Sequence, residues 1–145
     1  MKTNLSTTQE QSRRLLACGV SADTADMCYD SGALSLMDYD SAVHERDSRR
    51  ESYEVVPAWS LSTLLGLLPK EIDIDGYPYR ISIYFENPDE PVIGNQWCLY
   101  YKPKKHNEKS RIDDVAMYAE NLIECTVLMA EYLYEHGYKL NENKE

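Results

Sequence analysis

The chain has 145 residues, of which 43% are hydrophobic and 28% charged, and it carries a net charge of −10. This length is typical of one domain, so we expect a single domain over residues 1–139 and a disordered tail at residues 140–145. No apolar run approaches the ~20 residues that cross a bilayer, and the N-terminus is polar where an export signal needs an apolar stretch. The excess of acidic over basic side chains repels the phosphate backbones of nucleic acids. These features predict a cytoplasmic protein that binds neither membranes nor nucleic acid.

Cysteine and histidine usage gives no sign of a disulfide framework, a metal site or a cofactor site. The four cysteines lie in separate predicted elements without a CxxC pair, which favours reduced and mostly buried thiols: Cys18, Cys28, Cys98 and Cys125. The histidines are expected in a loop, a basic turn and a helix end: His44, His106 and His136. The sequence has no GxSxG, HExxH or phosphate-loop motif. We therefore assign no catalytic, metal-binding or cofactor-binding residue and regard an enzyme as the less favoured class.

The N-terminal half begins with helix signals and then loses its pattern. Thr7-Thr8-Gln9-Glu10 has the spacing of a capping box, and Gly19 stands where a helix would end, so a helix is predicted over residues 8–18. A further short helical turn is expected from Ser21 or Asp23, carrying Ala25, Met27 and Cys28 inward. The stretch His44-Glu45-Arg46-Asp47-Ser48-Arg49-Arg50-Glu51 has no apolar residue. We therefore predict a mobile loop at residues 41–54.

The middle of the chain predicts a strand, a short helix and an antiparallel meander. Val55-Val56-Pro57-Ala58-Trp59 is strand-like, and Ser60 then caps a helix whose Leu61, Leu64, Leu65 and Leu68 recur at helical spacing. Asp75-Gly76 is a favoured hairpin turn before the alternating Tyr79, Ile81, Ile83 and Phe85, and a third strand follows at residues 96–101. Glu71-Ile72-Asp73-Ile74-Asp75-Gly76 imitates a calcium loop, but Ser82 replaces the glutamate of the twelfth position, so the turn is favoured.

A long amphipathic helix is expected over residues 112–136, between Ser110 and Gly137. Its apolar face is centred on Leu122 and should pack on the meander, which gives an α+β fold of short N-terminal helices, a three-stranded antiparallel sheet and a long C-terminal helix. The opposite face is an acidic stripe: Asp113, Glu120, Glu124, Glu131 and Glu135. Met117 and Leu128 lie beside this stripe on one flank, which suggests a second contact and a possible homodimer.

Two segments resemble parts of small uncharacterised proteins carried by prophages and mobile elements of gut bacteria. They are Thr24-Ala25-Asp26-Met27 and Pro57-Ala58-Trp59-Ser60-Leu61-Ser62, followed by Leu64, Leu65, Leu67 and Leu68 and by the long C-terminal helix. The resemblance brings no established activity and no catalytic residue with it. It implies a biological setting and leaves the mechanism open.

Two groups of residues are candidate contact surfaces. Tyr84 and Tyr100 should project from the second sheet face beside Arg80 and Ser82, either as core beneath the N-terminal helices or as an open protein-binding surface. A possible anion contact is the basic run before the long helix, which is otherwise a solvated connection: Lys102, Lys104, Lys105, Lys109 and Arg111.

We therefore expect a non-catalytic accessory protein that binds another protein through the tyrosine-bearing face or through the Met117 and Leu128 flank. An acidic inhibitor that mimics DNA is the alternative, carried by the acidic stripe. A nuclease or hydrolase is third, with metal-binding carboxylates drawn from Asp73, Asp75 or Glu86.

Overall fold

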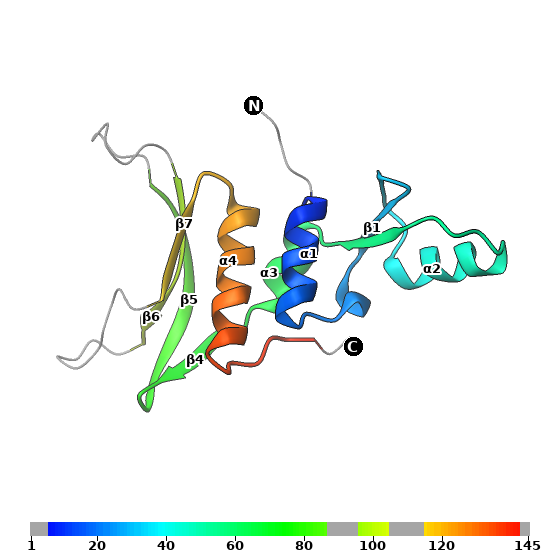
Figure 1. The fold of residues 1–145 in the computed structure, drawn as a ribbon. Coiled ribbons are helices and arrows are strands. Elements are labelled where there is room, and N and C mark those ends of the chain that lie inside the picture. The colour runs from blue at the N-terminus through cyan, green and yellow to red at the C-terminus, as the bar shows by residue number, and fades with distance from the viewer. Residues whose placement is uncertain (1–5, 87–95, 105–114, 143–145) are drawn as a thin grey trace. The chain divides into compact units, whose positions relative to one another are not determined.

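The computed structural model describes residues 6–86, 96–104 and 115–142, and its helices and antiparallel sheets confirm the α+β class. The chain divides into two compact units. The first unit comprises Met1–Leu67 and Asn141–Glu145, and the second comprises Leu68–Leu140. Each unit has an antiparallel sheet of its own, in the order β2-β1-β3 and β4-β5-β6-β7 (Figure 1). This division differs from the single domain that the length suggested.

The first unit opens with helix α1 (Gln9–Cys18), as the capping signals predicted. The Thr8 hydroxyl accepts from the Gln11 amide at 3.1 Å, and the Gln11 side chain accepts from the Thr8 amide at 2.9 Å. Gly19 ends the helix in the left-handed region at φ 118°. The expected second turn is a short 3-10 helix, η1 (Ala22–Thr24), which is followed directly by strand β1 (Met27–Asp30).

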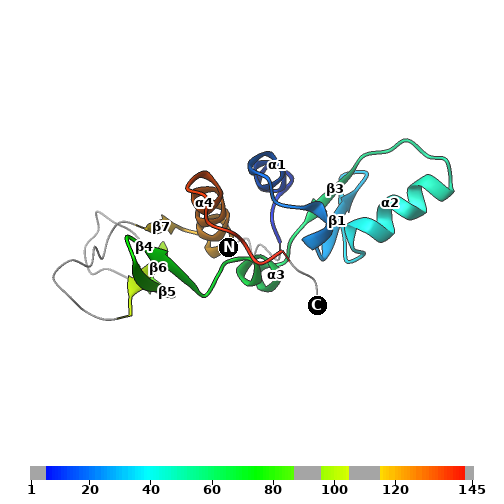
Figure 2. The ribbon, with the colours of Figure 1, turned by 90° about the horizontal axis from the view of Figure 1, so that it is seen from below.

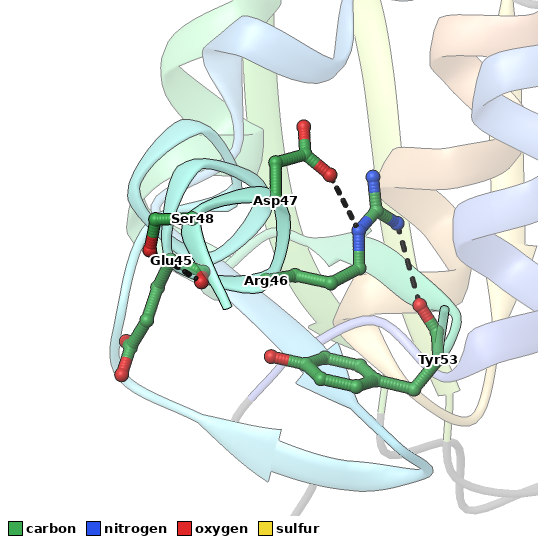
Figure 3. A network of polar contacts seen from close by, with 5 residues as sticks. All are labelled: Glu45, Arg46, Asp47, Ser48 and Tyr53. Atoms are coloured by element: carbon green, nitrogen blue, oxygen red, sulfur yellow. Dashed lines mark hydrogen bonds and ion pairs between the residues drawn. The ribbon is translucent and has the colours of Figure 1, made fainter. Parts of the chain in front are cut away.

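Strand β2 (Ala33–Ser35) precedes the region expected to be a mobile loop, residues 41–54, and helix α2 (Tyr39–Ser48) extends into that region. The Asp38 carboxylate caps α2 by accepting from the Ser41 amide at 2.7 Å. Near the other end of the helix, the Arg46 guanidinium donates to the Asp47 carboxylate at 3.1 Å and to the Tyr53 carbonyl at 3.3 Å (Figure 3). The loop prediction was therefore wrong over residues 41–48, whereas residues 49–54 belong to no helix or strand. Helix α2 is polar almost throughout and is anchored by a few residues: Ala42 packs with Cys28 and Val55, and Tyr39, Val43 and Tyr53 lie around them.

Strand β3 (Val55–Ala58) and helix α3 (Leu61–Leu67) complete the first unit. Trp59 between them is fully buried, and its indole N–H donates to the Thr24 hydroxyl at 2.9 Å. The Asp26 carboxylate accepts from the Ser60 amide at 2.8 Å and from the Ser60 hydroxyl at 2.6 Å, at the start of α3. The two sequence segments singled out by their resemblance are therefore hydrogen-bonded to each other.

The second unit is a meander of β4 (Glu71–Ile74), β5 (Tyr77–Glu86), β6 (Gln96–Pro103) and β7 (Ala116–Ala119). The predicted hairpin joins β4 to β5, with Asp75 and Gly76 at φ 52° and 86° and Ile74 opposite Tyr77. Positive φ at both central residues is the turn geometry that suits the twist of a hairpin. The three predicted strands are confirmed, and β7 adds a fourth.

Helix α4 (Leu122–Glu135) packs on β6 and β7, as a long C-terminal helix on the sheet was expected to do (Figure 1, Figure 2). It begins ten residues later than the predicted range, because Asn121 caps it by accepting from the Ile123 amide at 2.7 Å and the preceding residues form β7. Leu122 is half-buried and is not the centre of the packed face. That face consists of fully or almost fully buried residues: Ile123, Cys125, Thr126, Val127, Met129, Ala130 and Leu133.

The chain returns to the first unit after α4. Leu140 is 8% exposed, and the Asn141 amide donates to the Leu67 carbonyl at 2.7 Å. The Glu142 carboxylate accepts from the Ser21 amide at 3.0 Å. Residues 140–142 of the predicted disordered tail are therefore held by contacts, and residues 143–145 lie outside the described part.

Candidate functional site

The strand register of the second unit divides its sheet into two faces with different surroundings. Leu99 and Tyr101 of β6 point to the face on which α4 packs, and both are fully buried. The Tyr101 hydroxyl donates to the Pro69 carbonyl at 2.7 Å on this side. Side chains alternate along a strand, so the residues between them point to the opposite face. That second face carries the predicted tyrosines.

We name the second face the tyrosine face and define it by its described members from three strands: Ser82, Tyr84, Cys98, Tyr100 and Tyr118. Cys98 lies opposite Tyr84 on one side and Tyr118 on the other, and it is 1% exposed. The Tyr84 and Tyr100 rings meet edge to face with their centroids 5.4 Å apart. Tyr84 and Tyr118 nevertheless remain 40% and 48% exposed. Within the second unit, the described elements therefore leave both rings at the surface.

A basic corner, defined as Arg80, Lys102 and Lys104, adjoins the tyrosine face. Arg80 and Lys102 are exposed and lie directly opposite each other in the β5–β6 register. Their positive charges repel each other at this distance, which is destabilising. Together with Pro103 and Lys104 they line a hollow of about 320 Å³. The Lys104 ammonium also pairs with the Glu71 carboxylate at 2.9 Å. An anionic group in this hollow would relieve the repulsion between Arg80 and Lys102.

The structure brings some predicted contact residues together and separates others. Arg80, Tyr84, Tyr100 and Lys102 share one face. The expected flank of Met117 and Leu128 does not exist, because Met117 belongs to β7, opposite Leu99, while Leu128 lies on α4. The prediction of an interface on that flank was therefore wrong. The remaining members of the proposed anion contact lie outside the described residues: Lys105, Lys109 and Arg111.

The acidic stripe is shorter than the sequence suggested. Asp113 lies outside the described residues, and Glu120 precedes the helix, which leaves Glu124, Glu131 and Glu135 on α4. Glu124 and Glu131 are half-buried. A continuous row of exposed carboxylates along the helix is therefore not present in the part of the chain that is described.

Two exposed features were not recognised from the sequence. Tyr118 was assigned to a helix, although Val115, Met117 and Ala119 alternate with Ala116 and Tyr118 as a strand requires. Ile83 and Phe85 share the sheet face of Leu99, but α4 packs on β6 and β7, and these two residues of β5 remain 42% and 48% exposed. The Phe85 ring contacts the ring of Trp97 at a centroid distance of 5.1 Å.

The described residues bring no group of metal ligands together, and two of the buried cysteines have a raised pKa. Within residues 6–86, 96–104 and 115–142, no three His, Cys, Asp or Glu side chains are placed to hold a metal ion. Burial raises the pKa of the Cys125 thiol to about 11 and also raises the pKa of Cys28, which keeps both thiols protonated at neutral pH. The described helices are also too short or too polar to cross a membrane.

Comparison with protein families, with curated proteins and with solved structures finds no match for this chain. The functional argument therefore rests on the geometry of the second unit.

Proposed function

We propose that this chain is an accessory protein that acts by binding another protein through the tyrosine face of its second unit. The observation that carries the proposal is the exposure of Tyr84 and Tyr118, at 40% and 48%, on a sheet face opposite the one that packs α4. Large exposed aromatic residues are enriched in protein interfaces because their rings bury much area at a small cost in conformational entropy. Their hydroxyl groups also donate and accept hydrogen bonds at the same surface.

The basic corner defines the chemistry of the partner. Arg80 and Lys102 lie beside the tyrosines and line the same hollow. A partner that inserts an aspartate, a glutamate or a chain-terminal carboxylate there forms charge-assisted hydrogen bonds while its apolar side chains cover the tyrosine rings. We therefore expect an acidic segment flanked by apolar residues on the partner.

The alternatives have less support. A sheet with aromatic and basic residues also suits single-stranded nucleic acid, but the net charge of −10 opposes the approach of a phosphate backbone. The DNA-mimic alternative needs carboxylates at phosphate-like intervals over several elements, and in the described part α4 carries Glu124, Glu131 and Glu135 along a single helix. The setting that we propose is that of the prophage-borne proteins which the chain resembles.

Site-specific photocrosslinking tests the proposal directly. A benzophenone amino acid is placed at Tyr118 in one variant and at Leu36, which is 85% exposed in the first unit, in a matched control. Irradiation of cells that make each variant should give one discrete protein adduct from position 118 and none of the same mass from position 36. The Arg80→Glu change in the position-118 variant should abolish the adduct. The proposal is refuted if adducts from both positions are equal, if nucleic acid is captured, or if Arg80→Glu has no effect.

A further inference from the structure

Strand β5 has an edge that its neighbour β4 covers over part of its length. β5 runs over Tyr77–Glu86, whereas its pairing with β4 extends over Tyr77, Pro78, Tyr79 and Arg80 (Figure 1). The Ile81 amide still bonds to the Lys70 carbonyl at 3.0 Å, and beyond this bond no described strand lies on that side of β5. The second half of β5 is therefore an edge strand.

The backbone groups that this edge presents follow from the bonding pattern. In an antiparallel sheet, alternate residues of a strand bond to the neighbours on its two sides. The Ile81 amide points toward β4, and the Pro78 carbonyl accepts from the Lys104 amide of β6 at 3.1 Å. The backbone amide and carbonyl groups of Ile83 and Phe85 therefore point away from β6, toward the side that β4 does not cover. The backbone groups of Tyr84 point toward β6.

The side chains along this edge do not protect it from association. Exposed edges are normally blocked by a charged residue, a proline or a bulge. The five residues Ile81-Ser82-Ile83-Tyr84-Phe85 contain no charge and no proline. Ile83, Tyr84 and Phe85 are 42%, 40% and 48% exposed in succession, so both faces of the edge carry apolar surface.

We propose that two copies of this chain associate through antiparallel pairing of their β5 edges about a two-fold axis at Tyr84. In this register Ile83 of each copy lies opposite Phe85 of the other. The two residues of each pair exchange two N–H···O=C bonds, so the two pairs together form four hydrogen bonds. The two Tyr84 residues form the central pair without hydrogen bonds of its own. The result is a continuous sheet across the dimer in which the two tyrosine faces are contiguous.

The sequence of β5 is complementary to itself, so we expect a second copy of this chain to bind its exposed edge. The edge requires an extended, uncharged strand with large apolar residues at alternate positions, and β5 is such a strand. The centred register opposes isoleucine to phenylalanine and tyrosine to tyrosine, so no like charges meet among residues 82–85. A few hydrogen bonds and three side chains per copy make a small interface, which places the association at the weak end of protein complexes.

Sedimentation equilibrium at moderate salt, up to several hundred micromolar protein, tests the association. We expect the mass to rise from 16.8 kDa toward twice that value. Phe85→Lys should weaken the association roughly tenfold or more, because it places two like charges at the paired edge. The matched control is Tyr118→Lys, which changes an aromatic residue of equal exposure, 48%, on the far strand β7 and should leave the mass unchanged.

A disulfide test fixes the register. Antiparallel pairs without hydrogen bonds have Cα atoms about 4.5 Å apart, which is within the range of a disulfide. Tyr84→Cys in a background of Cys18→Ser and Cys98→Ala, which removes the thiol directly opposite position 84 in the same chain, should therefore give a covalent dimer under mild oxidation. Tyr100→Cys, on the same face but one strand away from the edge, is the control and should remain monomeric.

The outcomes separate this proposal from the proposed function. A monomer throughout the concentration range, or a dimer that resists Phe85→Lys and gives no Tyr84→Cys crosslink, overturns the β5 interface and leaves partner binding untouched. Loss of the photocrosslinked adduct on Arg80→Glu, with a dimer that this change leaves intact, is the pattern expected if both proposals hold.

Discussion

The buried hydrogen bond between Trp59 and Thr24 makes a quantitative prediction about the first unit. Trp59 is fully buried, Thr24 is 8% exposed, and the bond between the indole nitrogen and the hydroxyl oxygen is 2.9 Å long. Thr24→Val keeps the shape of the side chain but leaves the indole N–H without its partner. An unsatisfied buried donor costs about 1–3 kcal/mol. The Thr24 hydroxyl also donates to the Ser21 carbonyl at 2.7 Å, but Ser21 is exposed and water can replace that bond.

Urea unfolding measures this cost, and the two tryptophans allow each unit to be followed separately. Trp59 belongs to the first unit and Trp97 to the second, and the chain has no other tryptophan. In a Trp97→Phe background, emission reports on the first unit. With a slope of about 1–3 kcal/mol per molar urea, Thr24→Val should lower the midpoint by about 1 M.

A double-mutant cycle supplies the control. Trp59→Phe removes the N–H, so Thr24→Val should cost less in that background, with a coupling of about 1–2 kcal/mol measured by circular dichroism. The reasoning is refuted if Thr24→Val changes the unfolding free energy by less than about 0.5 kcal/mol, or if its cost is the same with and without the indole.

Four further predictions concern packing, turn geometry, thiol reactivity and the pH dependence of stability. Leu133→Ala, at a fully buried position of α4, should destabilise the second unit by about 2–5 kcal/mol, read from Trp97 emission in urea. Gly76→Ala should cost the same unit about 1 kcal/mol in that assay, because φ is 86° there and a Cβ strains the turn. At pH 8 an aromatic disulfide reagent should modify the half-buried Cys18 well before Cys125, whose raised pKa of about 11 leaves roughly one thiolate in a thousand. Because the folded pKa of Cys125 exceeds the unfolded value of 9.0, its contribution to stability is complete below pH 9, and the unfolding free energy should fall between pH 9 and 11.

The elements that the sequence predicted well are those with strong local signals. Thr8 and Gly19 define both ends of α1, and Asp75-Gly76 defines the hairpin, because each signal acts within a few residues of backbone. The placement of Tyr84 and Tyr100 on one sheet face followed from simple alternation along β5 and β6. Whether that face was covered did not follow, because alternation does not determine which side a distant helix occupies.

The errors have physical causes. Helix α2 was missed because few of its residues are apolar, and its stabilising features are polar and local: the Asp38 cap and the Arg49–Glu45 ion pair at 2.7 Å. The start of α4 was placed too early because Val115, Tyr118, Ala119 and Leu122 fit a helical period as well as they fit a strand followed by a helix. The Asn121 cap was the signal that separates the two. Asn141 returns to Leu67 within the first unit, and because these residues are far apart in the sequence no local pattern reveals their contact.

That last contact gives the chain an unusual connectivity. The Asn141 amide donates to the Leu67 carbonyl at 2.7 Å. The chain therefore leaves the first unit and returns to it at neighbouring residues. Residues 68–140 are thus an insertion with closely spaced ends, the arrangement at which one domain can be carried by another. A ribosome finishes such an insertion before its host is complete, so the second unit can fold while the first still lacks its final residues. Replacing residues 68–140 by a short glycine linker would then give a host protein that keeps its own sheet and loses the proposed binding surface.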